Sequence, residues 1–144
     1  LIPSQRAGGI AISAGLVGED KRWCPVNATT FESAIHKNIH VIGDAANAGA
    51  MPKSGYSANA EAKVCAINIV ALMNGRETTE LSGLNVCYSF LTNKEAVSVA
   101  GVYKVADGKI IGVPNSGGVS PDLSELEAVY AESWLKNILG DMST

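Results

Sequence analysis

The sequence has few charged side chains and no concentration of positive charge. Charged residues make up 17% of the 144 residues, and the formal net charge is −3. Lysine and arginine are scattered, and no basic stripe is interleaved with aromatic residues. Because nucleic-acid binding depends on clustered basic side chains, this composition argues against nucleic acid as a partner. No apolar run reaches the roughly 18 residues of a membrane-spanning helix, so we expect no transmembrane segment.

Two common binding motifs are also missing from the sequence. It contains no GxGxxG fingerprint, the glycine-rich loop that holds the pyrophosphate of a dinucleotide. The three cysteines, Cys24, Cys65 and Cys87, form no CxxC pair and no metal-ligand cluster, so we expect no bound metal. An odd number leaves at least one thiol without an internal partner. Each cysteine is either a small buried hydrophobic residue or, alternatively, half of a disulfide to something outside this chain.

What the sequence has in abundance is apolar and small residues. Hydrophobic residues make up 47% of the chain, and 15 residues are glycine. This balance excludes disorder and favours a turn-rich α/β or α+β domain over a helical bundle. The mean hydropathy is positive, which predicts apolar surface that contacts a cofactor, a further segment or a partner. The chain opens at Leu1 without an initiator methionine, and we expect it to be a piece of a longer protein.

Hydrophobic periodicity and turn residues predict short helices, strands and loops. The predicted helices cover residues 4–15, 57–73 and 123–139, and the predicted strands cover 23–26, 39–42, 84–91, 96–105 and 110–113. Residues 76–83 form a polar linker, and Asp107-Gly108 predicts a type I′ hairpin. The long middle helix, with Ser57 as its expected N-cap, is apolar on most faces and should be buried. In the last helix, steps of three and four place apolar residues on one face: Leu123, Leu126, Tyr130, Trp134 and Ile138.

The stretch after the predicted strand 39–42 is the most informative for chemistry. It ends in Gly43-Asp44, and ligands bind at the carboxyl ends of strands in open α/β sheets. The glycine would let a ligand approach the backbone, and the carboxylate could accept hydrogen bonds from ribityl or ribose hydroxyls. The helix beginning near Ser57 would point free N–H groups at the same place, which suits a pyrophosphate or a flavin. A Gly-Asp pair also forms an ordinary turn, so spacing alone leaves both interpretations open.

Longer motifs run through the whole sequence. Residues 30–45 read TFESAIHKNIHVIGDA and residues 51–59 read MPKSGYSAN, with further matches at 2–8, 23–26, 84–89, 116–119 and 133–134. The first two resemble the second FAD-binding signature of the two-dinucleotide flavoproteins. Taken together, the motifs resemble the flavoprotein subunit of flavocytochrome c sulfide dehydrogenase. That family oxidises sulfide at a redox-active disulfide beside FAD and passes the electrons to a c-type cytochrome subunit in the periplasm.

The resemblance implies a fold class of α/β plus α+β. Residues 1–77 would be the C-terminal portion of an FAD-binding Rossmann-like domain, with residues 1–5 leaving an inserted domain. Residues 78–144 would be a small α+β C-terminal domain that covers the flavin and lies at a dimer or cytochrome interface. Without the fingerprint and the inserted domain, the chain alone is expected not to turn over sulfide.

The same resemblance assigns roles to particular residues. Cys87 matches one of the two disulfide cysteines, whose partner would lie in an N-terminal part outside this chain. The implied FAD-binding residues are Gly43, Asp44, Lys53, Ser54, Gly55, Tyr56, Ser57 and Trp134. Without the resemblance, Cys87 would be a core residue, Trp134 one member of an apolar stripe and Lys53 a solvated lysine. Cys24 and Cys65 are expected to be structural, and His36 and His40 are surface or edge residues, with proton transfer as an alternative.

Two other functions remain open. The chain could be a fragment of a sulfide:quinone oxidoreductase, which needs an apolar or basic C-terminal surface at the bilayer. Against this, the last helix and its flanks carry one lysine, Lys136, beside five acidic residues: Asp122, Glu125, Glu127, Glu132 and Asp141. Such a surface favours docking of a soluble partner. Alternatively, residues 78–144 could be a non-catalytic module that docks the cytochrome.

Overall fold

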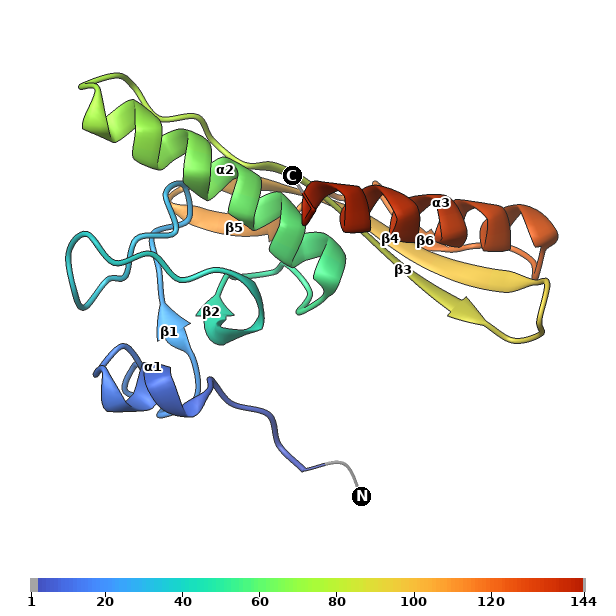
Figure 1. Cartoon of the computed structure of the whole chain (residues 1–144), viewed down its shortest axis with the longest axis horizontal. Coiled ribbons are helices and arrows are strands. Elements are labelled where there is room, and N and C mark those ends of the chain that lie inside the picture. The colour runs from blue at the N-terminus through green and yellow to red at the C-terminus, as the bar shows by residue number, and fades with distance from the viewer. Residues whose placement is uncertain (1–2, 144) are drawn as a thin grey trace.

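The computed structural model describes residues 3–143 and has an α+β fold (Figure 1). Residues 1 and 2, assigned to the N-terminal unit from the sequence, and residue 144, assigned to the C-terminal unit, lie outside this range. The elements, in chain order, are α1 (Gly9–Ser13), β1 (Cys24–Pro25), the 3-10 helix η1 (Gly43–Ala45), β2 (Ala46–Asn47), α2 (Gly55–Met73), β3 (Ser82–Phe90), β4 (Ala96–Ala106), β5 (Lys109–Gly112), β6 (Gly118–Val119) and α3 (Glu125–Asp141).

An antiparallel sheet forms the C-terminal part of the molecule. β4 pairs with β3, with β5 and with β6, and the long β3–β4 ladder runs from Ser82 opposite Lys104 to Phe90 opposite Ala96. Asp107 and Gly108 join β4 to β5 with positive φ angles of 49° and 71°, as a type I′ turn requires. The predicted strands 84–91, 96–105 and 110–113 and their hairpin are therefore confirmed.

The two long helices lie along the sheet (Figure 1). α2 packs against β3, whereas α3 packs against β4 and β3. Near the place where the two helices approach each other, Lys63 of α2 forms an ion pair of 2.6 Å with Asp141 of α3. The start of α2, the middle of β3 and the second half of α3 therefore meet at one junction.

The main apolar core lies between the loops of residues 26–51, α2 and the hairpin. Its buried members are Ala28, Phe31, Ala48, Met51, Cys65, Leu81 and Ile110. A smaller cluster, formed by Ala7, Ala11 and Cys24, lies under α1. Met51 and Ile110 bring the loops onto the hairpin, so the two halves of the chain share one core.

The prediction of a strand at residues 39–42 is wrong. His40 makes an isolated bridge to Glu32, and Ile39 and Ile42 are 42% and 39% exposed. β-branched residues favour a strand where a neighbouring strand supplies ladder hydrogen bonds. Within residues 3–143, parallel pairing is limited to β1 and β2, two residues each, so this segment has no ladder to join.

Two expectations for α2 are also wrong. Its N-cap is Ser54, whose Oγ accepts a hydrogen bond from the Ser57 N–H, and the helix begins at Gly55. The expected burial of its apolar residues fails too. The residues that α2 buries are Ser57, Glu61, Cys65 and Asn68, whereas Ile67, Val70 and Met73 are 57%, 57% and 82% exposed. Ser57, Glu61 and Asn68 can be buried because each has a hydrogen-bond partner in the interior.

In α3 the predicted apolar stripe is divided between two environments. Trp134 and Ile138 are partly buried, but Leu126 and Tyr130 are 57% and 49% exposed. Small residues, Ala128 and Ala131, are the ones that α3 buries. The helix begins at Glu125 with Ser124 as its N-cap, two residues later than predicted.

Candidate functional site

Most of the residues singled out from the sequence meet at the junction of α2, β3 and α3. We call the hollow there the junction pocket. Its volume is about 320 Å³, and its lining comprises Ser54, Gly55 and Tyr56 at the start of α2, Val86, Cys87, Tyr88 and Phe90 of β3, and Ala131, Trp134 and Leu135 of α3. Five of the predicted site residues, from three separate segments, therefore share one pocket: Ser54, Gly55, Tyr56, Cys87 and Trp134.

Aromatic rings form one wall of the junction pocket. Tyr56 and Trp134 stack nearly parallel, with ring centroids 6.0 Å apart and planes inclined by 11°. Tyr88 also lines the pocket. Burial raises the pKa of its phenol, and the negative charge of Glu127 raises it further. Flat aromatic walls suit a planar, conjugated ligand.

A buried polar network supports the Cys87 side of the pocket. Asn85 is only 3% exposed, and its Oδ1 accepts hydrogen bonds from the hydroxyls of Ser54 and Ser57. Its Nδ2 donates to Cys87 Sγ over 3.5 Å. The network therefore connects the N-cap of α2 to the sulfur in β3, and Asn85 is a residue that sequence reasoning did not single out.

The segment Gly43–Asp44 forms a second group, beside the junction pocket rather than in it. Gly43 has φ +68°, and a Cβ there would lie 3.3 Å from Ala58 Cβ. Its N–H donates to Glu61 Oε2 over 2.6 Å. Together with Ser54, Ser57 and Lys53, Gly43 and Glu61 line a small cavity of about 10 Å³. Ser57 therefore lies between the two groups.

Glu61 is the second residue that sequence reasoning missed. Its side chain is 2% exposed, and burial raises its pKa, against the opposing effects of the Gly43 N–H and Lys53. The signal available in the sequence was a single acidic residue between alanines on a helix that otherwise reads as apolar. Because it holds the N–H of Gly43, Glu61 fixes the backbone that presents Asp44.

Lys53 does not extend toward the junction pocket. Its Nζ donates to the carbonyl oxygens of Asp44 and Ala46, both over 2.7 Å, and lies 3.9 Å from the centroid of the Trp23 ring. Burial lowers the pKa of Lys53, and the nearby Asp44 carboxylate opposes that shift. Lys53 thus ties the Gly43–Asp44 turn to the loop before α2, a structural contact that its predicted flavin role did not include.

The remaining candidates have structural surroundings. Cys24 and Cys65 are buried, and burial raises the pKa of both thiols. Cys87 is partly exposed, and none of these three cysteines is paired within the described chain. His36 is exposed, and His40 Nδ1 lies 2.9 Å from the Thr30 carbonyl oxygen. Residues 3–143 contain no His, Cys, Asp and Glu cluster arranged for a metal ion.

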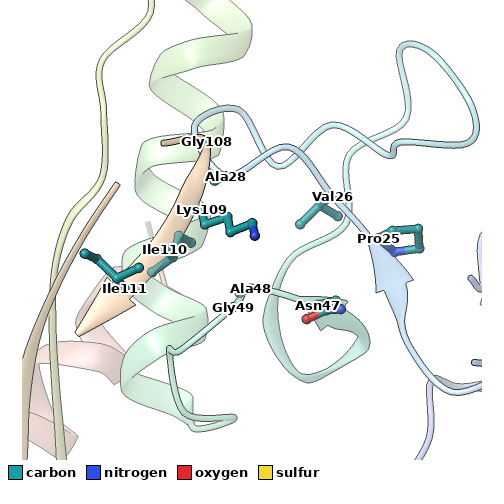
Figure 2. Close-up of a pocket in the computed structure, with 10 residues that line it drawn as sticks. All are labelled: Pro25, Val26, Ala28, Asn47, Ala48, Gly49, Gly108, Lys109, Ile110 and Ile111. Carbon is teal, nitrogen blue, oxygen red and sulfur yellow. The ribbon is translucent and has the colours of Figure 1, made fainter. Parts of the chain in front are cut away.

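A different pocket lies where the N-terminal loops meet the β4–β5 hairpin (Figure 2). It measures about 320 Å³ and is lined by Pro25, Val26, Ala28, Asn47, Ala48, Gly49, Gly108, Lys109, Ile110 and Ile111. Gly49 allows this contact, since a Cβ there would lie 2.6 Å from the Ile110 carbonyl oxygen. None of the residues predicted to be functional lines it, so the junction pocket is the stronger candidate.

The junction pocket has the chemistry that a flavin requires of its surroundings. Tyr56 and Trp134 offer an aromatic wall beside a planar ring system, and Cys87 places a sulfur in the same pocket. The start of α2 leaves the N–H groups of Gly55 and Tyr56 without intrahelical partners, and helix N-termini favour electron-rich or anionic groups. These residues therefore fit a flavin.

A comparison with known families agrees with this geometry. Residues 80–142 match the family model described as "Flavocytochrome c sulphide dehydrogenase, flavin-binding". This segment, which carries β3 to α3 with Cys87 and Trp134, is therefore a flavin-binding domain, and its cofactor is a flavin, consistent with FAD. The match agrees with the resemblance to flavocytochrome c sulphide dehydrogenase seen in the sequence. Across residues 3–143, no helix is long and apolar enough to cross a membrane.

Proposed function

We propose that this chain is the C-terminal part of a flavoprotein subunit that oxidises sulfide beside FAD and passes the electrons to a c-type cytochrome in the periplasm. The observation that supports this most is the position of Cys87 in the junction pocket, which the Tyr56–Trp134 pair and the start of α2 also line. The family that residues 80–142 match is consistent with an oxidoreductase of this kind.

Different parts of the chain contribute to holding the flavin. Trp134 and Tyr56 supply the aromatic wall, and the N–H groups of Gly55 and Tyr56 at the start of α2 would favour an electron-rich part of the cofactor. Glu61 holds the turn that presents Asp44, whose carboxylate could accept hydrogen bonds from hydroxyls of the cofactor. Residues 3–77 form the end of a Rossmann-like FAD domain in this proposal, and the sheet with α3 covers the flavin. FAD held by these residues would supply the two-electron acceptor that the sulfur chemistry needs.

The sulfur chemistry begins as a thiol–disulfide exchange. Hydrosulfide attacks a disulfide formed by Cys87 and a cysteine outside the described residues. One S–S bond forms between hydrosulfide and one cysteine, the S–S bond between the cysteines breaks, and the electron pair of the broken bond stays on the other cysteine as a thiolate. The products are one persulfide and one thiolate, so atoms and charge balance.

The test is Cys87→Ser in the complete flavoprotein. We expect sulfide-dependent reduction of cytochrome c to fall by at least about a hundredfold, since serine cannot form the disulfide. The absorption spectrum of the bound flavin should remain. Cys65→Ala is the matched control, because Cys65 is buried away from the junction pocket. Full activity of Cys87→Ser would remove Cys87 from the reaction.

The non-catalytic docking role is supported by a separate observation on α3. Leu126, Val129 and Tyr130 are 57%, 59% and 49% exposed, beside the acidic Glu125 and Glu132. An apolar patch with an acidic rim suits a soluble protein with a basic rim rather than an anionic bilayer. Leu126→Lys should weaken cytochrome binding and leave the flavin spectrum unchanged. Loss of quinone reduction instead, with cytochrome binding unaffected, would favour the sulfide:quinone oxidoreductase alternative.

A further inference from the structure

We propose that Asn85 is the positioning residue for Cys87: its amide N–H holds the sulfur and stabilises the negative charge that the sulfur gains when the disulfide breaks. This inference rests on the proposed sulfur chemistry, since it assigns to Cys87 the part of the leaving sulfur in the disulfide. It also makes a prediction about the thiol itself, which can be measured without any turnover.

The hydrogen bonds around Asn85 determine which end of its amide faces Cys87. Ser54 Oγ accepts the Ser57 N–H over 3.1 Å, which directs its own hydroxyl proton elsewhere, to Asn85 Oδ1. Ser57 Oγ donates to the same oxygen over 3.1 Å. Two hydroxyl donors need a carbonyl acceptor, so the oxygen of the amide faces α2. The sulfur lies 3.5 Å from Nδ2 and 4.0 Å from Oδ1, so the NH₂ group is its nearer partner.

Burial keeps the amide in this orientation. Asn85 and Ser57 are 3% and 1% exposed, and reversing the amide would put its NH₂ group against the two serine hydroxyls. A buried network whose groups are all paired is rigid, because breaking any of its bonds leaves an unsatisfied polar group. Cys87, two residues further along β3 and on the same side of the strand, is more exposed than Asn85. A reagent can therefore reach the sulfur while the residue that positions it stays covered.

The Nδ2–Sγ distance of 3.5 Å is that of a hydrogen bond to sulfur. A hydrogen bond to a charged acceptor is stronger than one to a neutral acceptor, so the amide N–H stabilises the negative charge that develops on the sulfur as the S–S bond breaks. A better leaving thiolate speeds disulfide exchange. Hydrosulfide then attacks the other cysteine of the disulfide and forms the persulfide there. The S–S bond breaks, and its electron pair moves to Cys87 Sγ, where the N–H of Asn85 meets the new charge.

A structural role for Asn85 alone makes a different prediction. If Asn85 only joined α2 to β3, removing its NH₂ group while keeping its oxygen would change stability but not the reactivity of Cys87. Asn85→Asp and Ser57→Ala make that separation together. The carboxylate of Asn85→Asp keeps an acceptor for both serine hydroxyls but puts a negative charge beside the sulfur, whereas Ser57→Ala loosens the amide without adding a charge.

The measurement is the alkylation rate of Cys87 by iodoacetamide at pH 7 in the reduced, full chain, followed by peptide mass spectrometry. We expect Asn85→Asp to slow it about fivefold, because the reacting sulfur loses an N–H donor and gains a carboxylate beside it. Ser57→Ala, which removes one of the two hydroxyls that orient the amide, should slow it about twofold. Cys65 in the same sample is the internal control, since it is buried in the core.

The outcomes separate this inference from the proposed function. Unchanged alkylation of Cys87 in Ser57→Ala, with native circular dichroism, would overturn the role of Asn85, because Asn85→Asp also slows the reaction through its own charge. If Asn85→Asp does not fold, Ser57→Ala alone decides, with its twofold effect expected and an unchanged rate contradicting it. Slower alkylation together with full sulfide oxidation by Cys87→Ser would support the positioning by Asn85 but overturn the sulfur chemistry built on it.

Discussion

The part before β3 and the part from β3 onward are built in opposite ways. From Ser82 onward, long strands pair with their neighbours in sequence through short turns. Before Ser82, the strands are two residues long, and the structure consists mainly of loops that buried polar side chains hold in place. The sheet is stabilised by local ladders that survive single substitutions, whereas the loop region depends on a few individual residues. We therefore expect substitutions before β3 to lower the unfolding free energy strongly and to disturb mainly the segments around them.

The largest effect is expected from Phe31→Ala. Phe31 is fully buried at the centre of the main core, and it holds a φ of +59° that side chains seldom adopt. Removing the ring should cost about 3–5 kcal/mol, and alanine, which keeps the Cβ, retains the backbone strain. Hydrogen exchange should show lost protection over residues 24–51, while β3 and β4 keep theirs. Equal loss in the long hairpin would mean that the two parts unfold as one unit.

Asn68→Ala should be the next most damaging change. Asn68 is fully buried, and its amide joins three segments: Nδ2 donates to the carbonyl oxygens of Thr29 (2.7 Å) and Thr79 (2.9 Å), and Oδ1 accepts the Thr79 N–H over 2.7 Å. Truncation leaves these backbone groups unpaired, at a cost of about 2–4 kcal/mol. Urea denaturation measures this loss of unfolding free energy. Asn74→Ala is the control, since Asn74 is exposed and its Nδ2 bonds within its own helix, to the Val70 carbonyl oxygen.

The sequence predicted the region from β3 onward well, because its signals are local. Alternating apolar residues and Asp107-Gly108 determine strands and turn from neighbours along the chain. It predicted less before β3, where Ile39–Ile42 reads as a strand that has no ladder to join. The polar residues buried by α2 were also beyond a hydrophobic pattern: nothing local reveals that Glu61 will meet Gly43, eighteen positions earlier.

The candidate site divides in the same way. Family motifs pointed to Cys87, Trp134 and the start of α2, and the structure brings these together. They did not point to Asn85, because its role depends on two serines from another element. Lys53 was assigned from the motif as a flavin-binding residue, which stays a prediction, and the structure adds the bonds of its ammonium group to two backbone carbonyls. Motifs identify residue types in a segment, whereas hydrogen-bond direction appears only when the segments are packed.

Glu61 gives a pH test of the region before β3. Its pKa is raised in the folded state by burial, so the unfolded chain releases the proton more readily. Its protonation therefore stabilises the fold below the unfolded pKa, and this contribution is lost as pH rises through the folded pKa. Glu61→Gln keeps an acceptor for the Gly43 N–H and cannot ionise.

We therefore expect the unfolding free energy of Glu61→Gln to exceed that of the wild type increasingly as pH rises from about 4.5, the ordinary value for a glutamate. Glu61→Ala should instead destabilise by about 1–3 kcal/mol, since the Gly43 N–H loses its partner. Chemical denaturation at pH 4, 6 and 8 distinguishes the two. If the unfolding free energies of Glu61→Gln and the wild type instead converge as pH rises, the folded protein stabilises Glu61 in its ionised form.

The smallest effect is expected from Gly108→Ala in the hairpin. Gly108 has φ +71°, and a Cβ there would meet no atom within 4 Å. The cost is therefore backbone strain alone, about 1 kcal/mol. Gly49→Ala is the matched comparison, because Gly49 also has a positive φ, 62°, but a Cβ there would lie 2.6 Å from the Ile110 carbonyl oxygen. Thermal unfolding should show a clearly larger loss for Gly49→Ala, since the loop region can relieve that clash only by separating from the hairpin. Equal losses at the two glycines would mean that the contact between loop and hairpin contributes little, and that the two regions are less dependent on each other than their shared core implies.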